Sequence, residues 1–401
     1  MRRPSIFPAL LMMTALAGAQ DITFYGDVLP ILQNRCQECH RAGQMAPMAL
    51  TTFAEARPWA KAIREEVVKR TMPPWFADPH FGKFSNDRRL TDHEIDTLAK
   101  WAEMGSVEGR EADAAPRRVW NEGWNLPRVD EVVAMDEPFT VPAKEPLQYQ
   151  YLVIAADFDE DKWVQGVELR PSDRAVVHHA VVYIRPAGDT WKRGPTTNDI
   201  LTVYAPGSAP DVFRSDMAKL IPAGADLVLE VHYTPKGQAT QDRIEVGLML
   251  APVRPAKRVI TLQMANTSFS IAPGAKDQRV TVWGTLPNDA LLIGFFPHMH
   301  LRGKSFEYTQ VDAEGHAETL LLVEPYDFYW QLSYRLAEPL AIKKGTKLNW
   351  IATYDNSAGN ARNPDPAARV GYGIQSWDEM MVGFFDIAID AGIDKQAFFV
   401  R

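Results

Sequence analysis

The stretch from Cys36 to His40 reads C-Q-E-C-H and brings two thiols and an imidazole together within five residues. This spacing is typical of covalent haem attachment, in which each thiol forms a thioether with a haem vinyl group and the histidine binds the iron. A redox dithiol or half of a zinc site has the same two-thiol spacing, but zinc would need further ligands, for which His80 and His93 are the nearest candidates. We therefore predict one covalently bound haem c, held by Cys36, Cys39 and His40.

The opposite face of the iron needs a second ligand, and Met72 is our candidate. It lies 32 residues after His40 and is followed by two prolines, which stiffen a loop and favour a fixed side chain. The stretch resembles the Met-Pro-Pro ligand loop of small bacterial class I cytochromes c. His80 is the rival ligand, and a methionine that only packs on Trp75 is the interpretation without a haem.

Five of the nine histidines lie in three compact motifs within apolar segments that favour β-strands. Neutral imidazoles that share one face can hold a transition metal. A set of His178, His179 and His232 would suit copper or zinc. Because consecutive strand residues face opposite sides, His178 and His179 could bind one ion only at a bulge or a twisted strand end. Otherwise one is a ligand and the other a buried histidine.

His298 and His300 are two residues apart, so on a strand they point to the same face. The third ligand of this second site must come from elsewhere, and Met380 is a candidate. A thioether is a soft ligand that favours copper(I) and is poor for zinc. Residue type alone also allows Met380 to be an ordinary core methionine.

Two helical patterns surround the C-x-x-C-H motif. One covers residues 53–70, and the other begins with a capping box at Thr91 and stops at Gly105. We expect a small all-α cytochrome c domain over residues 22–106. A charged, proline-containing linker follows over residues 107–130.

After residue 130 the pattern changes to short apolar segments separated by Pro, Gly and Asp turns, which is typical of antiparallel sandwiches. The segment also carries a weak internal duplication. Four residues recur 121 positions later: Ile221, Gly224, Leu227 and Tyr233 reappear as Ile342, Gly345, Leu348 and Tyr354. The same offset carries His179 onto His300, although short strand patterns can also match by chance.

The duplication completes the expected fold class, which is multidomain. After the all-α domain we predict two antiparallel β-sandwich, jelly-roll-like domains, the first over residues 131–255 and the second over residues 256–401. Each would present one histidine cluster.

Composition excludes some functions. The chain has 401 residues and a formal net charge of -8, which argues against a nucleic-acid surface. Residues 1–19 read as a cleaved secretory signal, with Arg2 and Arg3 before an apolar run and small residues at the cleavage site. A buried first helix is the alternative. No later apolar stretch is long enough to cross a bilayer, so we expect a soluble periplasmic or secreted protein.

Residues 130–390 resemble the copper type II monooxygenases, the family of peptidylglycine α-hydroxylating monooxygenase and dopamine β-monooxygenase. The resemblance depends on motifs in the same order: His178-His179, the segment 229–233 that ends in His232-Tyr233, His298-x-His300 followed by Gly303-Lys304, and Asp378-Glu379-Met380.

The resemblance implies two copper ions. His178, His179 and His232 would hold an electron-storing copper, and His298, His300 and Met380 the catalytic copper that binds and activates O2. The family hydroxylates a C–H bond, with the two coppers across a solvent-filled cleft between two sandwiches.

Two departures from the family bear on the substrate. An arginine that holds the substrate carboxylate in peptide-hydroxylating members is Phe296 here, and a tyrosine four residues after the ligand methionine is Phe384. Both changes favour a small apolar or aromatic substrate. The sandwich disulfides of the family are also absent, because both cysteines belong to the haem motif.

The leading hypothesis is an exported haem- and copper-containing monooxygenase. An external donor would supply electrons, and the haem would pass them toward the copper of His178, His179 and His232. A non-catalytic copper-binding or electron-transfer protein is the main alternative. A zinc hydrolase with Glu230 as its base, and a haem segment that serves another partner, are further alternatives.

Overall fold

The structure is a computed structural model. It describes residues 22–42, 44, 46–120, 123–144, 147–189, 199–205, 207–312 and 314–394. The predicted signal over residues 1–19 lies outside these ranges. Of the described residues, 39% are in strands and 12% in helices, and none of these helices is long and apolar enough to cross a membrane.

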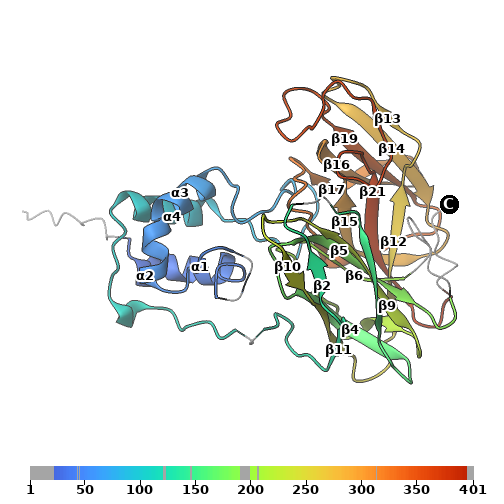
Figure 1. Cartoon of the computed structure of the whole chain (residues 1–401), viewed down its shortest axis with the longest axis horizontal. Coiled ribbons are helices and arrows are strands. Elements are labelled where there is room, and N and C mark those ends of the chain that lie inside the picture. Colours follow the sequence, from blue (N-terminus) through green and yellow to red (C-terminus); the bar gives the residue numbers. More distant parts are fainter. Residues whose placement is uncertain are drawn as a thin grey trace, which may run out of the picture.

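The helices are short and gather at one end of the molecule (Figure 1). They are η1 (Phe24–Val28), α1 (Leu29–Arg35), α2 (Phe53–Ala56), η2 (Arg57–Trp59), α3 (Ala60–Val68), α4 (Asp92–Glu103) and η3 (Glu111–Asp113). Helix α4 begins at the predicted capping box and is followed by Gly105 with a φ of 88°. The predicted helix over 53–70 is instead interrupted by η2, where Pro58 cannot donate a backbone hydrogen bond.

The predicted all-α cytochrome c domain over residues 22–106 was wrong. Residues 74–89, here called the strap, leave the helices and cross to the strands. Trp75, Ala77 and Phe84 of the strap are buried in the core of the second sandwich. Ala77 forms a β-bridge with Val323. The helices therefore form only a small cluster around residues such as Trp101, because the large apolar side chains between α3 and α4 find more burial against the sheets.

The strands of the first half of the β region are β1 (Glu131–Ala134), β2 (Phe139–Val141), β3 (Gln150–Ala155), β4 (Lys162–Pro171), β5 (Val177–Arg185), β6 (Asp199–Tyr204), β7 (Asp211–Val212), β8 (Met217–Ile221), β9 (Asp226–Tyr233), β10 (Thr240–Asp242) and β11 (Ile244–Leu250). Sheet β3-β9-β5-β6 packs over strands β1, β11, β4 and β8, and their inner faces enclose an apolar core.

The second half contains β12 (Lys257–Ala265), β13 (Ser270–Ile271), β14 (Gln278–Thr285), β15 (Ala290–His298), β16 (Gly303–Val311), β17 (Ala317–Val323), β18 (Tyr334–Ile342), β19 (Lys347–Tyr354), β20 (Val370–Gly371) and β21 (Val382–Asp390). Sheet β14-β19-β16-β17 covers strands β12, β21, β15 and β18, with a second apolar core between the layers. The predicted boundary at residue 255 lies between β11 and β12.

The two sandwiches are not separate sheets, which corrects the expected fold class again. One nine-stranded sheet runs in the order β1-β11-β4-β8-β12-β21-β15-β18, with β7 paired to β4. The halves join where β8 and β12 pair in parallel, at Met217 with Lys257 and Ala218 with Arg258. The duplication is visible in strand positions, because β19 lies 121 residues after β9 at both ends. Each of these strands follows a turn with a positive-φ glycine, Gly224 or Gly345.

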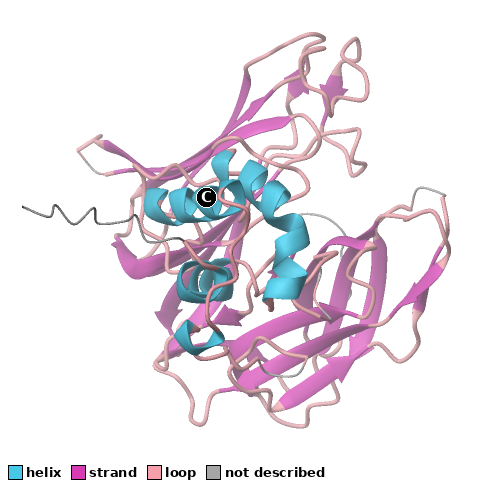
Figure 2. Ribbon diagram, turned by 90° about the vertical axis from the view of Figure 1, so that its left-hand side faces the viewer, coloured by secondary structure: helices cyan, strands magenta, loops and turns pink. Residues whose placement is uncertain are grey.

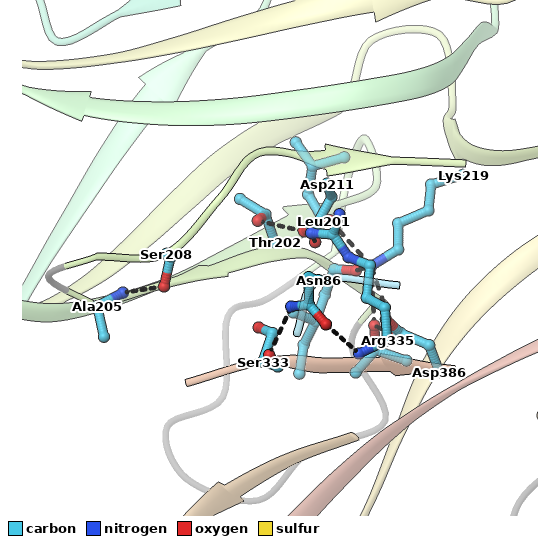
Figure 3. Close-up of polar contacts among 12 residues, drawn as sticks. Asn86, Leu201, Thr202, Ala205, Ser208, Asp211, Lys219, Ser333, Arg335 and Asp386 are labelled. Atoms are coloured by element: carbon cyan, nitrogen blue, oxygen red, sulfur yellow. Dashed lines mark hydrogen bonds and ion pairs between the residues drawn. The ribbon is translucent and has the colours of Figure 1, made fainter. Parts of the chain in front are cut away.

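A cluster of polar residues ties the halves and the strap together (Figure 3). This polar junction consists of Asn86, Asp211, Lys219, Arg335 and Asp386. The Lys219 side chain is 3% exposed, and its Nζ donates to the carbonyls of Ile200 and Leu201 at 3.0 and 2.9 Å. Arg335 on β18 pairs with Asp211 on β7. Asn86 of the strap donates to the Ser333 carbonyl and accepts from the Arg335 N–H. Figure 2 shows the helices against this β framework.

Candidate metal centre

A bulge in β5 lets two consecutive histidines reach the same place. Val177 pairs with Tyr233 of β9 and His179 pairs with His232, so His178 is an extra residue in the register. A bulged residue departs from strict alternation. The imidazole Nδ1 atoms of His178 and His179 lie 2.9 Å apart. Strand alternation required such a bulge if both rings were to bind one ion.

His232 completes a set of three. Each of His178, His179 and His232 offers a ring nitrogen, and these nitrogens all lie within 4.8 Å of one another. Buried nitrogens that lack a hydrogen-bond partner among the described residues include Nε2 of His178 and Nδ1 of His232. Such atoms normally have partners, because an unsatisfied buried polar group costs about 1–3 kcal/mol. A bound cation would satisfy them, so the residues fit a metal ion.

Tyr149 orients the ring of His179 in this set. Its hydroxyl lies 3.0 Å from Nε2 of His179, and its ring stacks on His232 at a centroid distance of 4.9 Å. If Nε2–H of His179 donates to the Tyr149 oxygen, the Nδ1 lone pair is free to bind a metal. Metal-binding histidines commonly have their second nitrogen held in this way.

His298 and His300 lie at the end of β15 and just beyond it, and both rings are held through Nδ1. Nδ1 of His298 is 2.7 Å from Oε1 of Gln331, and Nδ1 of His300 is 3.3 Å from the Asp378 carbonyl oxygen. Donation to these oxygens leaves Nε2 of each ring as the ligand atom. Nε2 of His300 is buried and has no partner in the described chain, which again fits a metal.

The buried carboxylate of Glu379 joins this pair to the methionine motif. Its two oxygens accept the backbone N–H groups of His300 at 2.9 Å and Arg302 at 2.6 Å. Burial raises the pKa of Glu379 to about 8, against the opposing effect of these hydrogen bonds and of the Arg302 guanidinium. The contacts fix the segment after β15 against the residue that precedes Met380.

The two histidine sets adjoin. The ring centroids of His179 and His298 are 5.4 Å apart, as close as those of His298 and His300 at 5.2 Å. The sequence resemblance implied two sites separated by a solvent-filled cleft, and in this structure the two sets are instead in contact. The sandwiches also meet through an apolar contact that includes Val181 and Phe384, so the five histidines form one cluster, in which only His232 is not fully buried.

All five imidazoles are neutral at pH 7. Burial is the main cause of the lowered pKa values. Neighbouring imidazoles add to it for all but His298, where the hydrogen bond to Gln331 opposes it. The pKa falls to about 3 for His178 and to about 4 for His232 and His298. It lies well below the usual range for His179 and His300. Neutral rings keep the lone pairs that a metal needs.

Met380 and Met381 have different surroundings. Met380 lines a cavity together with His179 and His298, whereas Met381 is fully buried in the core of the second sandwich. Of the two adjacent methionines, Met380 is therefore the one that lines the cavity beside the histidine cluster.

The cavity beside the cluster encloses about 650 Å³, including space open to solvent. Its walls are largely aromatic and include Phe296, Phe384, Tyr151 and Tyr372. The rings of Phe296 and Phe384 are 6.0 Å apart in an edge-to-face arrangement. Glu230 adds a polar group to the lining. A small ligand with an apolar or aromatic body matches these walls.

A second cavity, of about 810 Å³ including open space, surrounds the C-x-x-C-H motif. Cys36, Cys39, His40 and Met72 all line it. Nδ1 of His40 is 3.3 Å from the Met48 carbonyl oxygen, which leaves Nε2 for a metal. Burial lowers the pKa of His40 and keeps the ring neutral. The residues therefore fit a haem.

The alternatives at this motif fit less well. Burial raises the pKa of the Cys36 thiol to about 12, which disfavours the thiolate that zinc binds but not a thioether. The rival iron ligand His80 has an 82% exposed side chain and a hydrogen bond to Asp78, and it does not line the cavity. His93 is exposed on α4.

Several residues at the site were not predicted from the sequence. Tyr149, Gln331 and Glu379 hold ligand rings or their backbone, and Phe328 stacks on His178 at 4.4 Å. Gln331 carries no motif, and it lies 33 residues from the histidine that it contacts. The one usable signal was Glu379, which stands in the Asp378-Glu379-Met380 motif next to a candidate ligand.

Comparisons with known proteins give little further information. The sequence matches no protein-family model and no curated protein. The structure of PNGF-II in space group P21 is similar with a TM-score of 0.29 and 10% identity, over 65% of this chain. The major capsid protein P2 of bacteriophage PM2 has a TM-score of 0.29 and 6% identity, over 65% of this chain and 98% of its own.

An infectious bursal disease virus structure, of the Gx strain, has a TM-score of 0.20 and 9% identity over 71% of this chain and 78% of its own. The chain spans 65% of the length of PNGF-II. At these scores the likeness carries no information on the function of this chain.

Proposed function

We propose that the chain is an exported haem- and copper-containing monooxygenase that hydroxylates a C–H bond of a small apolar or aromatic substrate with O2. The observation that best supports the proposal is the cluster of five neutral histidines, four of them buried, with Met380 beside it in an aromatic cavity. Imidazole together with thioether is a ligand set suited to copper in both of its oxidation states.

The proposal assigns His178, His179 and His232 to one copper and His298, His300 and Met380 to the other. Bound copper would supply single-electron chemistry and a place for O2 to bind. The protein's own part is to hold the ligand rings. Tyr149 and the Gln331 side chain fix one ring in each set, at 3.0 and 2.7 Å.

The residues that line the cavity would orient the substrate. Phe296 and Phe384 would contact its apolar or aromatic body and exclude water from the reacting carbon. At the polar end Tyr183 donates to Glu230 at 3.3 Å. Burial raises the pKa of Tyr183 well above its usual value, so this hydroxyl keeps its proton.

The helical end would serve as the electron source. Cys36 and Cys39 would bind a haem covalently, with His40 and Met72 as iron ligands, and an external donor would reduce it again after each transfer. A reductant tethered to the same chain acts at a high effective concentration.

A second candidate function is a non-catalytic copper-binding or electron-transfer protein. The 5.4 Å separation of the His179 and His298 rings favours it, because the two sets adjoin instead of facing each other across an open cleft. Both candidates predict bound copper and differ in whether O2 is consumed with a substrate.

The first experiment is the haem and metal content of the protein purified after export, beside His298→Ala and Met380→Ala. The matched controls are His316→Ala and Met104→Ala, which alter exposed residues away from the cluster. Two coppers and one haem per chain, with one copper weakened or lost only in the first two variants, would support the proposal. Zinc in place of copper, or full copper in all variants, would refute it.

The loaded protein is then screened for O2 uptake with small aromatic and apolar compounds. Substrate-dependent uptake with formation of a hydroxylated product supports the monooxygenase. Copper and haem that undergo redox cycles without any such uptake would support the electron-transfer candidate.

A further inference from the structure

One short segment of the second sandwich touches both candidate cofactor sites. It runs from Tyr326 to Gln331 between β17 and β18 and is here called the bridging loop. One of its residues lines the cavity around the C-x-x-C-H motif, and three others, Phe328, Tyr329 and Gln331, contact the histidine cluster. No sequence motif marks this loop.

At the haem-binding end the contact is made by Trp330. Its ring lines the cavity together with Cys36, Cys39 and His40. The ring also packs closely over Gly207 of the first sandwich, where a side-chain carbon would lie only 3.1 Å from it. Arg88 of the strap donates to the Gly207 carbonyl at 2.8 Å and lies 3.6 Å from the Glu38 carboxylate of the motif. Trp330 is therefore held against the wall of the cavity.

At the metal end the contact is made by Phe328. Its ring stacks on His178 with a centroid distance of 4.4 Å and an interplanar angle of 27°. Phe328 is 5% exposed. Gln331, three residues further on, forms the hydrogen bond to His298. The aromatic ring nearest to the histidine set of the first sandwich thus lies two residues from the ring that lines the haem-binding cavity.

The bridging loop is firmly held. The backbone N–H of Trp330 donates to the Asp327 carbonyl at 3.0 Å, and the Gln331 side chain donates to the Phe328 carbonyl at 3.1 Å. Both oxygens of the Asp327 carboxylate accept from Arg362, at 2.5 and 2.7 Å. These bonds fix the turn that separates Trp330 from Phe328, so the two rings keep their positions relative to the two sites.

We infer that the bridging loop is the electron path between the two sites, with Trp330 and Phe328 as its residues. This inference rests on the proposed function. A ferrous haem held by Cys36, Cys39 and His40 would lose one electron and become ferric. Copper(II) held by His178, His179 and His232 would gain that electron and become copper(I). No bond forms or breaks and no proton moves, so the transfer is balanced. Electron tunnelling weakens steeply with distance and with gaps between atoms, and packed aromatic rings shorten those gaps.

The loop reaches the two histidine sets in different ways. The Phe328 ring stacks on His178, whereas it is 6.2 Å from His300 and nearly perpendicular to it. The aromatic contact therefore leads to the set formed by His178, His179 and His232, and the set that includes Met380 is reached through the hydrogen bond of Gln331 to His298.

The test uses the full-length protein with haem and copper loaded and oxygen removed. A flash-generated small reductant reduces the haem, and its reoxidation is followed by absorbance while the copper(II) signal is followed by electron paramagnetic resonance. The variants are Trp330→Leu, Phe328→Leu and the conservative Trp330→Phe. Trp283→Leu, a change at a 61% exposed tryptophan on β14, is the matched control.

We expect haem reoxidation to be about tenfold slower in each leucine variant, because loss of the ring weakens the electronic coupling while the driving force stays the same. Trp330→Phe and Trp283→Leu should stay near the wild-type rate. Haem spectrum, haem potential and copper content should not change, which separates a lost path from a damaged site. If Phe328→Leu fails to fold, the pair Trp330→Leu and Trp330→Phe decides the result.

The possible failures are distinguishable. If wild-type protein binds no haem or no copper, the proposed function fails and the path fails with it. If both cofactors bind and both leucine variants transfer electrons at the wild-type rate, the bridging loop is not the path and the proposed function stands.

Discussion

The contact between Gln331 and His298 gives a sharp test of how the second histidine set is held. Gln331 is 1% exposed, and its Oε1 lies 2.7 Å from Nδ1 of His298. Replacing it with leucine removes the acceptor and leaves a buried ring nitrogen without a partner. The ring is then free to turn or to change its tautomer.

The size of the effect follows from the same contact. An unsatisfied buried polar group costs about 1–3 kcal/mol, and the loss of an outer hydrogen bond to a metal-binding histidine weakens metal affinity about 10–100-fold. The two figures agree, because each tenfold change in affinity corresponds to about 1.4 kcal/mol. We therefore expect Gln331→Leu to weaken one of two copper sites by about 10–100-fold.

The assay is a competition titration of copper against a chelator of known affinity, with both sites followed in the same experiment. Gln331→Glu keeps an acceptor oxygen and should retain most of the affinity. Gln165→Leu makes the same substitution on β4, where the side chain donates to the Arg214 carbonyl away from the histidines, and should not change copper affinity. A folded Gln331→Leu protein with both affinities unchanged would refute the argument.

Three further predictions concern stability. Because the pKa of His298 is about 4 in the folded protein and about 6.5 when unfolded, the metal-free protein should lose stability as pH falls from 6.5 to 4, by about 3 kcal/mol for this ring alone; flat urea unfolding midpoints across that range would contradict this. Lys219→Met should lower the free energy of unfolding by about 3 kcal/mol, because it removes the hydrogen-bond donor to buried carbonyls at the polar junction. Chemical denaturation measures this loss, with Lys61→Met at an exposed lysine as the control. Phe84→Ala should lower the free energy of unfolding by about 3–5 kcal/mol, because Phe84 of the strap is buried in the second sandwich. Val119→Ala, at a 90% exposed side chain, should be neutral. An unchanged thermal midpoint for Phe84→Ala would show that the strap is not part of that core.

The local features of the fold could be predicted from the sequence. The capping box at Thr91, the stop at Gly105 and the change to strands after residue 130 all depend on neighbouring residues, and the structure has each of them. The paired histidines are also local patterns. The bulge at His178 was stated as a condition because strand alternation makes the two possible outcomes explicit.

Features that depend on distant contacts were missed. The residues next to Trp75 and Phe84 in the sequence do not show that these side chains pack in the core of the second sandwich instead of among the helices. The all-α domain was therefore predicted wrongly. The parallel pairing of β8 with β12 involves only two residue pairs and leaves no periodic signal. The contact between His179 and His298 depends on how the sandwiches close, which strand patterns do not determine.

The strap also has a consequence for how the protein is made. Its apolar residues complete a core whose other members, such as Phe306 and Phe385, come much later in the chain. At translation rates of about 5–20 residues per second, Trp75 and Phe84 remain without that core for on the order of tens of seconds. During this interval chaperones can bind the exposed apolar residues of the strap, and the thiols of Cys36 and Cys39 belong to a chain that has not finished folding. A fragment that ends before β12 would expose the strap permanently, so the helical end is not an independent unit that could be exchanged or expressed by itself.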